Sequence, residues 1–266
     1  MMSRRPRRSE QETRDLVMRA AVQHVSLHGL RATLDLPMEE VIAAADVPRA
    51  AAYRLWTSRE RFTSDVLEQL ALGQTLPSTL RPDEIDIVVD EVAASTSPQD
   101  DARTVLCSLT ALAIEREFDL LTDSDAWRAF LALEAAVASL PDPGRRTTLV
   151  RRFIEAEAAN AARIAEIYRA VGAALELRPN SEQALLDAAH AARILTRGLI
   201  GEAIREGVSP AERAALRRRL STSTSAIFGQ TFQPDGDGTA PVDWQQSVLA
   251  VFRRSRSTER DLRNTT

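Results

Sequence analysis

The 266-residue sequence contains no lysine, one cysteine, three histidines and few aromatic residues. The single cysteine, Cys107, excludes an internal disulfide and a zinc site built from cysteines, and we expect a reducing, cytoplasmic location. Because 5% of the residues are aromatic while 44% are hydrophobic, the core must consist mainly of Ala, Leu, Val and Ile, which favours closely packed helices. Patterns typical of strands are absent, so we expect an all-α protein.

Long apolar runs and catalytic motifs are also missing. No segment approaches the roughly 18 apolar residues that a membrane span needs, and no apolar signal-peptide region follows the N-terminal arginines. The sequence has no glycine-rich phosphate loop, no Gly-x-Ser-x-Gly turn and no His-Glu-x-x-His or Glu-x-x-His pair for a metal. We therefore expect no membrane partner, no cofactor, no metal site and no enzyme activity.

The charged residues are unevenly distributed along the chain. Residues 1–61 contain eleven arginines and eight acidic residues, a net charge of +3, and the rest contains 23 arginines and 30 acidic residues, a net charge of −7, which together give −4. A basic N-terminal segment (residues 1–61, the head) attached to an acidic remainder (residues 62–266, the body) orients the head toward a polyanion such as DNA. All basic side chains are arginine, a bias that a GC-rich genome produces without a functional cause.

Residues 39–62, EEVIAAADVPRAAAYRLWTSRERF, predict two short helices separated by a tight turn at residues 46–48. In the first helix Val41 and Ile42 belong to a stripe with the three-and-four spacing of a buried helix face. Pro48 suits the first position of the second helix, where its missing N–H is not needed. The stretch therefore has the layout of a helix-turn-helix motif.

The second short helix carries Arg49, Tyr53 and Arg54 about one turn apart. Two guanidinium groups and a phenol at this spacing can reach the edge of a DNA groove and its phosphates together. Thr57 with Glu60 predicts a capping box at the start of the next helix. These residues indicate a DNA-binding helix-turn-helix.

The segment over residues 13–62 resembles the N-terminal DNA-binding domain of TetR-type (TetR/AcrR) transcriptional regulators. The resemblance is carried by a first helix that ends at Gly29, by Ala32-Thr33, and by AAADVPRAAAYRLWTSRERF, which is similar to the family's run from an Ala-Gly-Val turn through Tyr-x-x-Phe to Ser-Lys-Glu. It implies an all-α homodimer whose larger C-terminal domain binds a small molecule and then releases DNA. By position, Tyr53 corresponds to the tyrosine that contacts phosphate, and Arg59 to a lysine near the next helix start.

Three positions depart from the family pattern. Asp46 replaces the glycine of the turn and adopts a left-handed backbone less readily. Residues 50–52 are alanines where the family has Gly-Thr-Leu, so the helix has fewer hydrogen-bonding groups and depends more on Arg49 and on contacts with thymine methyl groups. The link over residues 34–37 is longer than usual, which leaves the start of the second helix open.

We expect four segments. They are a disordered basic arm (1–8), a three-helix helix-turn-helix DNA-binding domain (9–56), a helical-bundle ligand-binding and dimerisation domain (57–232) that begins with a connecting helix (57–76), and a linker, short helix and basic tail (233–266). Within the bundle we expect helices over 83–94, 145–175 and 180–204, two helices divided near Thr122, and a capped helix start at Ser209. Trp244, Val248 and Phe252 at four-residue spacing predict the short extra helix.

The candidate DNA contacts lie in the head and in the N-terminal arm. They are Arg49, Ala50, Ala51, Tyr53, Arg54, Arg59, Thr33, Arg4, Arg5, Arg7 and Arg8. The four arginines of the arm either follow the DNA backbone or enter a minor groove, or they belong to a disordered tail without a role.

The candidate ligand contacts lie in the bundle and are Phe118, Trp127, Phe130, Glu134, Tyr168, His190 and Arg193. Trp127, Phe130 and Glu134 fall on one helix face, so Glu134 either binds an amine or hydroxyl group of a ligand or is a boundary residue paired with solvent or arginine. The aromatic residues either line an apolar pocket or belong to the core.

The candidate dimerisation residues are Leu195, Gly198, Leu199, Gly201 and Leu216. Small and branched residues on the last two long helices allow close crossings in a four-helix interface between two copies, or the same helices pack within one chain.

The leading hypothesis is therefore a ligand-responsive transcriptional regulator that binds a palindromic operator as a homodimer. The resemblance to the TetR/AcrR family, whose members are most often repressors, implies that it represses transcription. Its partners would be double-stranded operator DNA, a small-molecule effector and a second copy of the chain. The alternative is a helical ligand- or protein-binding module whose degenerate head no longer binds DNA.

Overall fold

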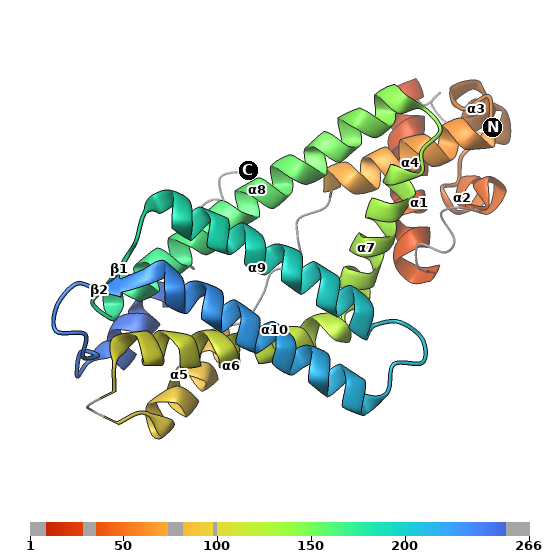
Figure 1. Ribbon diagram of the computed structural model, residues 1–266. Coiled ribbons are helices and arrows are strands. Elements are labelled where there is room, and N and C mark those ends of the chain that lie inside the picture. The colour runs from red at the N-terminus through yellow and green to blue at the C-terminus, as the bar shows by residue number, and fades with distance from the viewer. Residues whose placement is uncertain (1–8, 29–35, 74–81, 98–99, 254–266) are drawn as a thin grey trace, which may run out of the picture. The chain divides into compact units, whose positions relative to one another are not determined.

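The computed structural model describes residues 9–28, 36–73, 82–97 and 100–253 of the chain. These residues are mostly helical (Figure 1), so the all-α expectation is confirmed apart from one pair of short strands. The chain divides into two compact units. Unit 1 contains residues 1–76 and 125–156, and unit 2 contains residues 77–124 and 157–266.

Unit 1 is built from helices that are distant in sequence. Its elements are α1 (Glu10–His28), α2 (Met38–Ala44), α3 (Arg49–Leu55), α4 (Arg59–Gly73), α7 (Asp125–Ala138) and the first part of α8 (Pro143–Ala174). A single apolar core joins them, and it includes Val17, Val41 and Phe62 together with Leu133 and Val137 of α7. Helices α2 and α3 have seven residues each, too few for stability in isolation, so packing onto this core maintains them. The division therefore differs from the expected boundary after residue 56.

Unit 2 contains α5 (Pro82–Ser95), α6 (Ala102–Thr122), the rest of α8, α9 (Glu182–Ala203) and α10 (Pro210–Thr231). The expected helices and the division near Thr122 are confirmed. Helix α10 packs along both α6 and α9 (Figure 1). The predicted cap of α10 is also confirmed, because Ser209 and Glu212 form a reciprocal capping box with proline in the first turn.

Two three-residue strands in unit 2 were not expected from the sequence. Strand β1 (Leu177–Pro179) pairs antiparallel with β2 (Phe232–Pro234), with Leu177 opposite Pro234. Leu177 and Phe232 are buried, so burial of these two side chains and not β propensity decides this pairing. The segment after β2 was expected to be a flexible linker, which is wrong for the described residues: backbone hydrogen bonds from Asp235 to Glu176 (2.9 Å) and from Ala240 to Asp100 (3.2 Å) attach it to unit 2.

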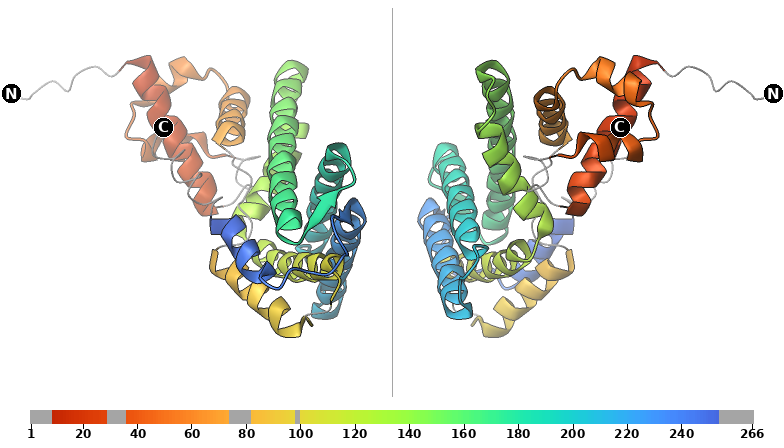
Figure 2. Two further views of the ribbon diagram at one scale, coloured as in Figure 1. Left: turned by 90° about the vertical axis from the view of Figure 1, so that its left-hand side faces the viewer. Right: turned by 90° about the vertical axis from the view of Figure 1, so that its right-hand side faces the viewer.

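The extra helix predicted near the C-terminus is confirmed over residues 244–253. Trp244, Val248 and Val251 are buried in the same apolar cluster as Val88, Val89 and Val92 of α5, and Figure 2 shows this helix (dark blue) beside α5 (yellow). Gln245 also donates a hydrogen bond of 2.8 Å to Asp90. The helix thus covers an apolar face of α5. The expected basic tail after it lies outside the described residues.

Candidate functional site

The turn between α2 and α3 has the geometry that the sequence indicated. Asp46 adopts a left-handed backbone with φ of 49°, the conformation for which glycine is usually required. Val47 is buried below the turn. Pro48 is the N-cap of α3 rather than its first residue, one position earlier than predicted, and its carbonyl accepts a hydrogen bond of 2.8 Å from the Ala51 backbone N–H. Helix α2 begins at Met38, the boundary that the sequence had left open.

One face of α3 is buried and the opposite face is exposed. Ala52 within the helix and Trp56 at its end are fully buried, and the Trp56 ring packs edge-on against Phe62 with centroids 5.3 Å apart. This packing fixes the rotation of α3 about its axis. Arg49, Ala50, Tyr53 and Arg54 are consequently exposed, with Tyr53 at 42% of its maximum, whereas Ala51 is half-buried against the core.

A carboxylate on α2, which the sequence analysis did not select, holds two of these exposed groups. The guanidinium of Arg49 and the hydroxyl of Tyr53 both donate hydrogen bonds to the same oxygen, Oε1, of Glu39. The Arg49 guanidinium also lies over the Tyr53 ring, 5.8 Å from its centroid. Hydrogen bonds with Tyr53 and then Glu39 raise the pKa of Arg49. A single anionic oxygen thus binds both groups at once.

The start of α4 differs from the predicted cap. Ser58, not Thr57, is the capping residue, because its hydroxyl accepts a hydrogen bond of 3.2 Å from the Arg61 N–H. The pKa of Glu60 is lowered by a hydrogen bond from its own backbone and by one from Ser58. Arg59 is exposed, and its Nε donates to the carbonyl of Leu36 at 3.3 Å. The other candidate DNA contacts, namely Arg4, Arg5, Arg7, Arg8 and Thr33, lie outside the described residues.

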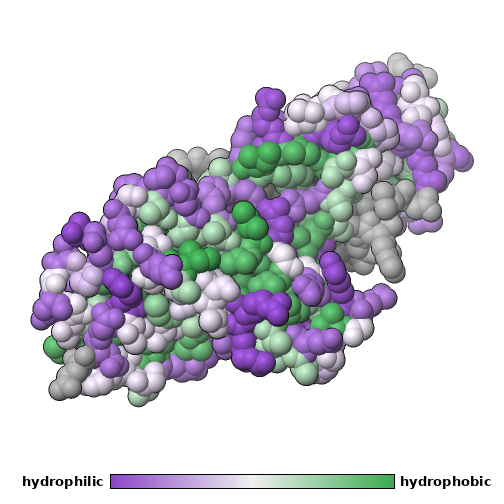
Figure 3. Space-filling model, viewed as in Figure 1, coloured by the Kyte–Doolittle hydropathy of each residue, from purple (hydrophilic) through white to green (hydrophobic). Residues whose placement is uncertain are grey.

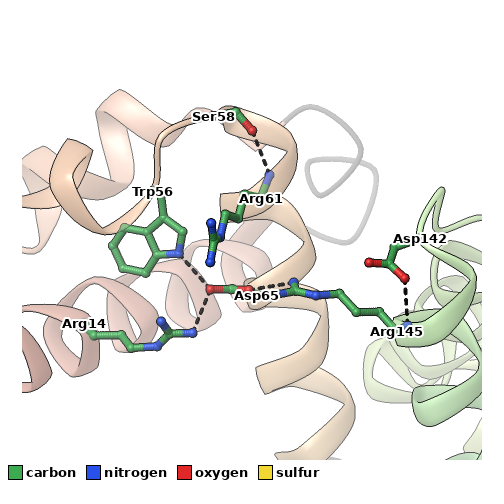
Figure 4. A network of polar contacts seen from close by, with 7 residues as sticks. All are labelled: Arg14, Trp56, Ser58, Arg61, Asp65, Asp142 and Arg145. Carbon is green, nitrogen blue, oxygen red and sulfur yellow. Dashed lines mark hydrogen bonds and ion pairs between the residues drawn. The ribbon is translucent and has the colours of Figure 1, made fainter.

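A buried carboxylate on α4 connects four segments of unit 1 (Figure 4). Asp65 accepts hydrogen bonds from Arg14 of α1 (2.7 Å), from the indole of Trp56 (3.0 Å) and from Arg145 in the first turn of α8 (2.8 Å). Burial raises the pKa of Asp65, but the hydrogen bonds from Arg145 and Trp56 lower it by more, so the net shift is downward. One side chain thus links the end of α3 to the start of α8. The sequence contained no signal for it, because its partners are 51, 9 and 80 residues away.

The candidate ligand contacts fall into both units. In unit 1, Trp127 and Phe130 are fully buried and pack on one another with centroids 5.5 Å apart, and Phe130 also meets Phe153. This arrangement fits the interpretation of these rings as core residues. Glu134 is half-buried on the same helix.

The remaining candidates belong to unit 2. Phe118 is fully buried, and the ring of Tyr168 stacks on Phe228 of α10 with centroids 3.5 Å apart and planes inclined by 4°. Arg193 is buried and forms an ion pair of 3.3 Å with Glu157, whereas His190 is half-buried. Arg193 and Arg197 of α9 and Glu157 of α8 therefore form a polar cluster inside unit 2.

Glu117 on α6 belongs to the same cluster but was not selected from the sequence. Desolvation by the surrounding protein raises its pKa to about 7, and the nearby charges of Arg193 and Arg163 lower it by less. A usable signal was present, since Glu117 interrupts an otherwise apolar helix face seven residues after Thr110.

The candidate dimerisation residues are only partly accessible. Leu216 is buried within its own chain at 6% exposure, which leaves little of its side chain for contact with a second copy. Leu195, Leu199 and Gly201 are half-buried, and Gly198 is exposed, with open space where a Cβ atom would lie. Ile194, which was not predicted, is 70% exposed on the same helix, and Figure 3 shows apolar side chains gathered over the middle of α9. The sequence alone does not show that Ile194 faces outward, because the rotation of α9 about its axis depends on its packing against α10.

Searches of the described residues find no group of three or more side chains that could hold a metal ion. In the same part of the chain no helix combines the length and apolar composition of a membrane span. A comparison with protein-family models finds no model that matches this sequence, and a comparison with curated proteins finds no significant match.

Proposed function

We propose that the protein is a ligand-responsive transcriptional regulator that binds a palindromic DNA operator as a homodimer and is released by a small molecule. The observation that carries this proposal is the α2–α3 pair. A seven-residue helix begins after a left-handed turn, buries Ala52 and Trp56 beneath it, and leaves Arg49, Tyr53 and Arg54 exposed on the other face. An exposed helix face with two guanidinium groups and a phenol suits the major groove and its flanking phosphates.

The geometry of α3 is compatible with entry into DNA. An α-helix with its side chains is about 10–12 Å in diameter, and the major groove is about 12 Å wide, so a helix such as α3 can lie in it. Arg49 at its N-terminal end would contact base edges, Tyr53 and Arg54 one turn later would contact phosphates, and Arg59 would extend the contact beyond the helix. The exposed Ala50 can meet a thymine methyl group without steric conflict.

The exposed apolar face of α9 supports a homodimer. Ile194 at 70% exposure is unfavourable in water, and an exposed glycine in a helix interior costs stability unless a close approach requires it. Two α9 helices crossing at Gly198 would bury both residues and pair two copies around a two-fold axis. A dimer of this kind reads two half-sites about 34 Å apart or somewhat more.

Helix α8 contributes side chains to both units. Its first turn supplies Arg145 to the Asp65 contacts in unit 1, and later turns supply Glu157 to the ion pairs with Arg193 and Arg197 in unit 2. Release by a ligand requires that the ligand bind the DNA-bound and the free state of the protein with different affinity.

The direct test is selection of binding sites from a random duplex library, followed by fluorescence anisotropy on the selected duplex at increasing salt. Binding should weaken about a hundredfold or more between roughly 50 and 200 mM salt, because several phosphate contacts release counterions. Arg49→Ala should alter base preference, whereas Tyr53→Phe should weaken all duplexes alike. Arg178→Ala, which removes an exposed arginine of unit 2, serves as the control. Absence of salt-dependent binding to any duplex would favour the helical binding module without DNA affinity.

A further inference from the structure

One face of α9 has a residue spacing that is the same in both directions along the helix. The residues on this face are separated alternately by four and three positions, and they are Asp187, Ala191, Ile194, Gly198, Gly201 and Arg205. Arg205 follows the last residue of α9, Ala203, by two positions. Because the spacing has an average period of 3.5 residues, these side chains form one stripe along the helix, about 27 Å long.

The stripe is accessible in the single chain. Its exposed members are Asp187, Ile194, Gly198 and Arg205, and its half-buried members are Ala191 and Gly201. The other side of α9 is occupied, because Ala189 and Ala192 are buried in the apolar core of unit 2 and Arg197 pairs with Glu157 at 2.9 Å. An isoleucine that is 70% exposed in the middle of a long helix is unfavourable in water, so the stripe is a face without a partner in its own chain.

The shape of the stripe is complementary to a second copy of itself. Two α9 helices related by a two-fold axis at the position of Thr196 run antiparallel, and each Ile194 then lies opposite Gly198 of the other copy. A Cβ atom on Gly198 would have no atom within 4 Å, so this glycine leaves open space that the isoleucine side chain can fill. In the same arrangement Ala191 lies opposite Gly201, and two such small residues allow the helices to approach closely.

The charges at the two ends of the stripe are complementary in the same register. Asp187 lies nine residues before Thr196 and Arg205 nine residues after it, so each carboxylate meets the guanidinium of the other copy. Asp187 also accepts a hydrogen bond of 2.8 Å from the amide of Gln183, which leaves its charge in place. A parallel pair would oppose like charges at both ends, and a shift by seven residues would place Arg205 against Ile194. The sequence of the stripe therefore favours one orientation and one register.

We propose that this face of α9 binds a second copy of the chain in an antiparallel pair centred at Thr196, with Ile194 packed over Gly198 and Asp187 paired with Arg205. The inference rests on the proposed homodimer and deepens it by assigning the register and the charge pairs that select the partner. An isologous contact requires matching residues at equal distances on both sides of one point, whereas a contact with an unrelated protein requires no such symmetry. The occupant that the stripe fits is thus the same chain.

Charge exchange, followed by sedimentation of the full-length protein without DNA, tests the pairing. Asp187→Arg and Arg205→Asp should each weaken the dimer roughly tenfold or more, because each change places two pairs of like charges against one another. The double variant should recover wild-type affinity, and an equal mixture of the two single variants should form mixed dimers. Asp235→Arg, which reverses an exposed charge of unit 2 outside α9, is the control and should dimerise as the wild type does. Single variants as tight as the control, or a double variant as weak as the singles, would overturn the pairing.

Disulfide cross-linking tests the register directly. In a Cys107→Ser background, a chain with Ala191→Cys is mixed with a chain that carries Gly201→Cys, which places the two thiols opposite one another. We expect mild oxidation to give covalent dimers that contain one chain of each kind. Two copies of the Ala191→Cys chain should not cross-link, because their cysteines lie ten residues apart along the pair, about 15 Å, whereas a disulfide needs Cα atoms within about 7 Å. Equal cross-linking of the Ala191→Cys chain alone, or none in the mixture, would exclude this register.

The outcomes distinguish this inference from the proposed function. A wild-type protein that stays monomeric at its highest soluble concentration would overturn both the pairing and the proposed homodimer. A dimer that does not respond to the charges at positions 187 and 205 would overturn the pairing and leave the homodimer standing. Because DNA is absent from these experiments, none of these results bears on the contacts proposed for α3, which the salt-dependent binding assay tests separately.

Discussion

Replacement of Asp65 by asparagine removes the charge that three segments of unit 1 share. The Asp65 side chain is 5% exposed and accepts hydrogen bonds from Arg14, Trp56 and Arg145. Asparagine keeps one acceptor oxygen for the buried indole N–H of Trp56, but its NH2 group then faces the guanidinium of Arg145, and a donor opposed to a donor costs about 1–3 kcal/mol. The Arg14 and Arg145 side chains are 44% and 35% exposed and can rehydrate, so each lost ion pair adds at most about 1 kcal/mol. We expect a total loss of about 1–5 kcal/mol in the free energy of unfolding.

Urea unfolding followed by tryptophan fluorescence measures this loss, because Trp56 and Trp127 report on unit 1. The matched control is Asp15→Asn, which removes an exposed carboxylate from α1 and should change stability by less than about 0.5 kcal/mol. If Asp65→Asn unfolded at the same urea concentration as Asp15→Asn, the carboxylate would not be a stabilising link between the end of α3 and α8.

The stabilisation by Asp65 should also depend on pH. Its pKa in the folded protein is lowered below the unfolded value of about 3.9, chiefly by the hydrogen bonds from Arg145 and Trp56, which outweigh the effect of burial. The carboxylate therefore stabilises unit 1 above about pH 4, and this contribution is lost as the pH falls through the folded-state pKa. The difference between wild type and Asp65→Asn should shrink below about pH 4. A constant difference down to the acid transition would contradict this reasoning.

Four further predictions concern α2, α8 and α9. Glu39→Gln should strengthen binding to a selected duplex about three- to tenfold in anisotropy titrations, because a neutral amide oxygen holds Arg49 and Tyr53 less strongly than the carboxylate does and does not repel phosphate. Glu40→Gln should have the smaller effect of charge alone. Gly172→Ala should lower the free energy of unfolding of unit 2 by about 1–3 kcal/mol in urea, because its Cβ would lie 2.4 Å from a ring carbon of β2. Gly198→Ala, whose Cβ meets open space, should leave the stability of a monomer equal or up to about 1 kcal/mol higher, and a loss would refute the helix-propensity argument. Ile194→Asp should shift the protein toward monomer in sedimentation, and an unchanged mass would exclude this face of α9 as the contact between copies.

Local signals predicted the helices well because helix starts and ends depend on residues three or four positions apart. The capping box at Ser209 and the left-handed turn at Asp46 were recognisable from a few consecutive residues. The same kind of reasoning was wrong by one residue at Thr57, since Ser58 beside it is an equally good cap and only the path of the chain into α4 decides between them. The candidate site was recovered in part: the exposed groups on α3 were predicted, but Glu39 and Glu117 were not.

By itself the sequence determined that this protein is helical, where most of its helices begin and end, and which side chains share a helix face, because these properties follow from composition, caps and a period of 3.6 residues. Only the tertiary structure decided how each helix is rotated and which distant segments meet. It buried Leu216 and exposed Ile194, paired β1 with β2, and brought Arg14, Trp56 and Arg145 to Asp65. These outcomes depend on the packing of side chains that are tens of residues apart, and no local pattern in the chain records which of them will be neighbours.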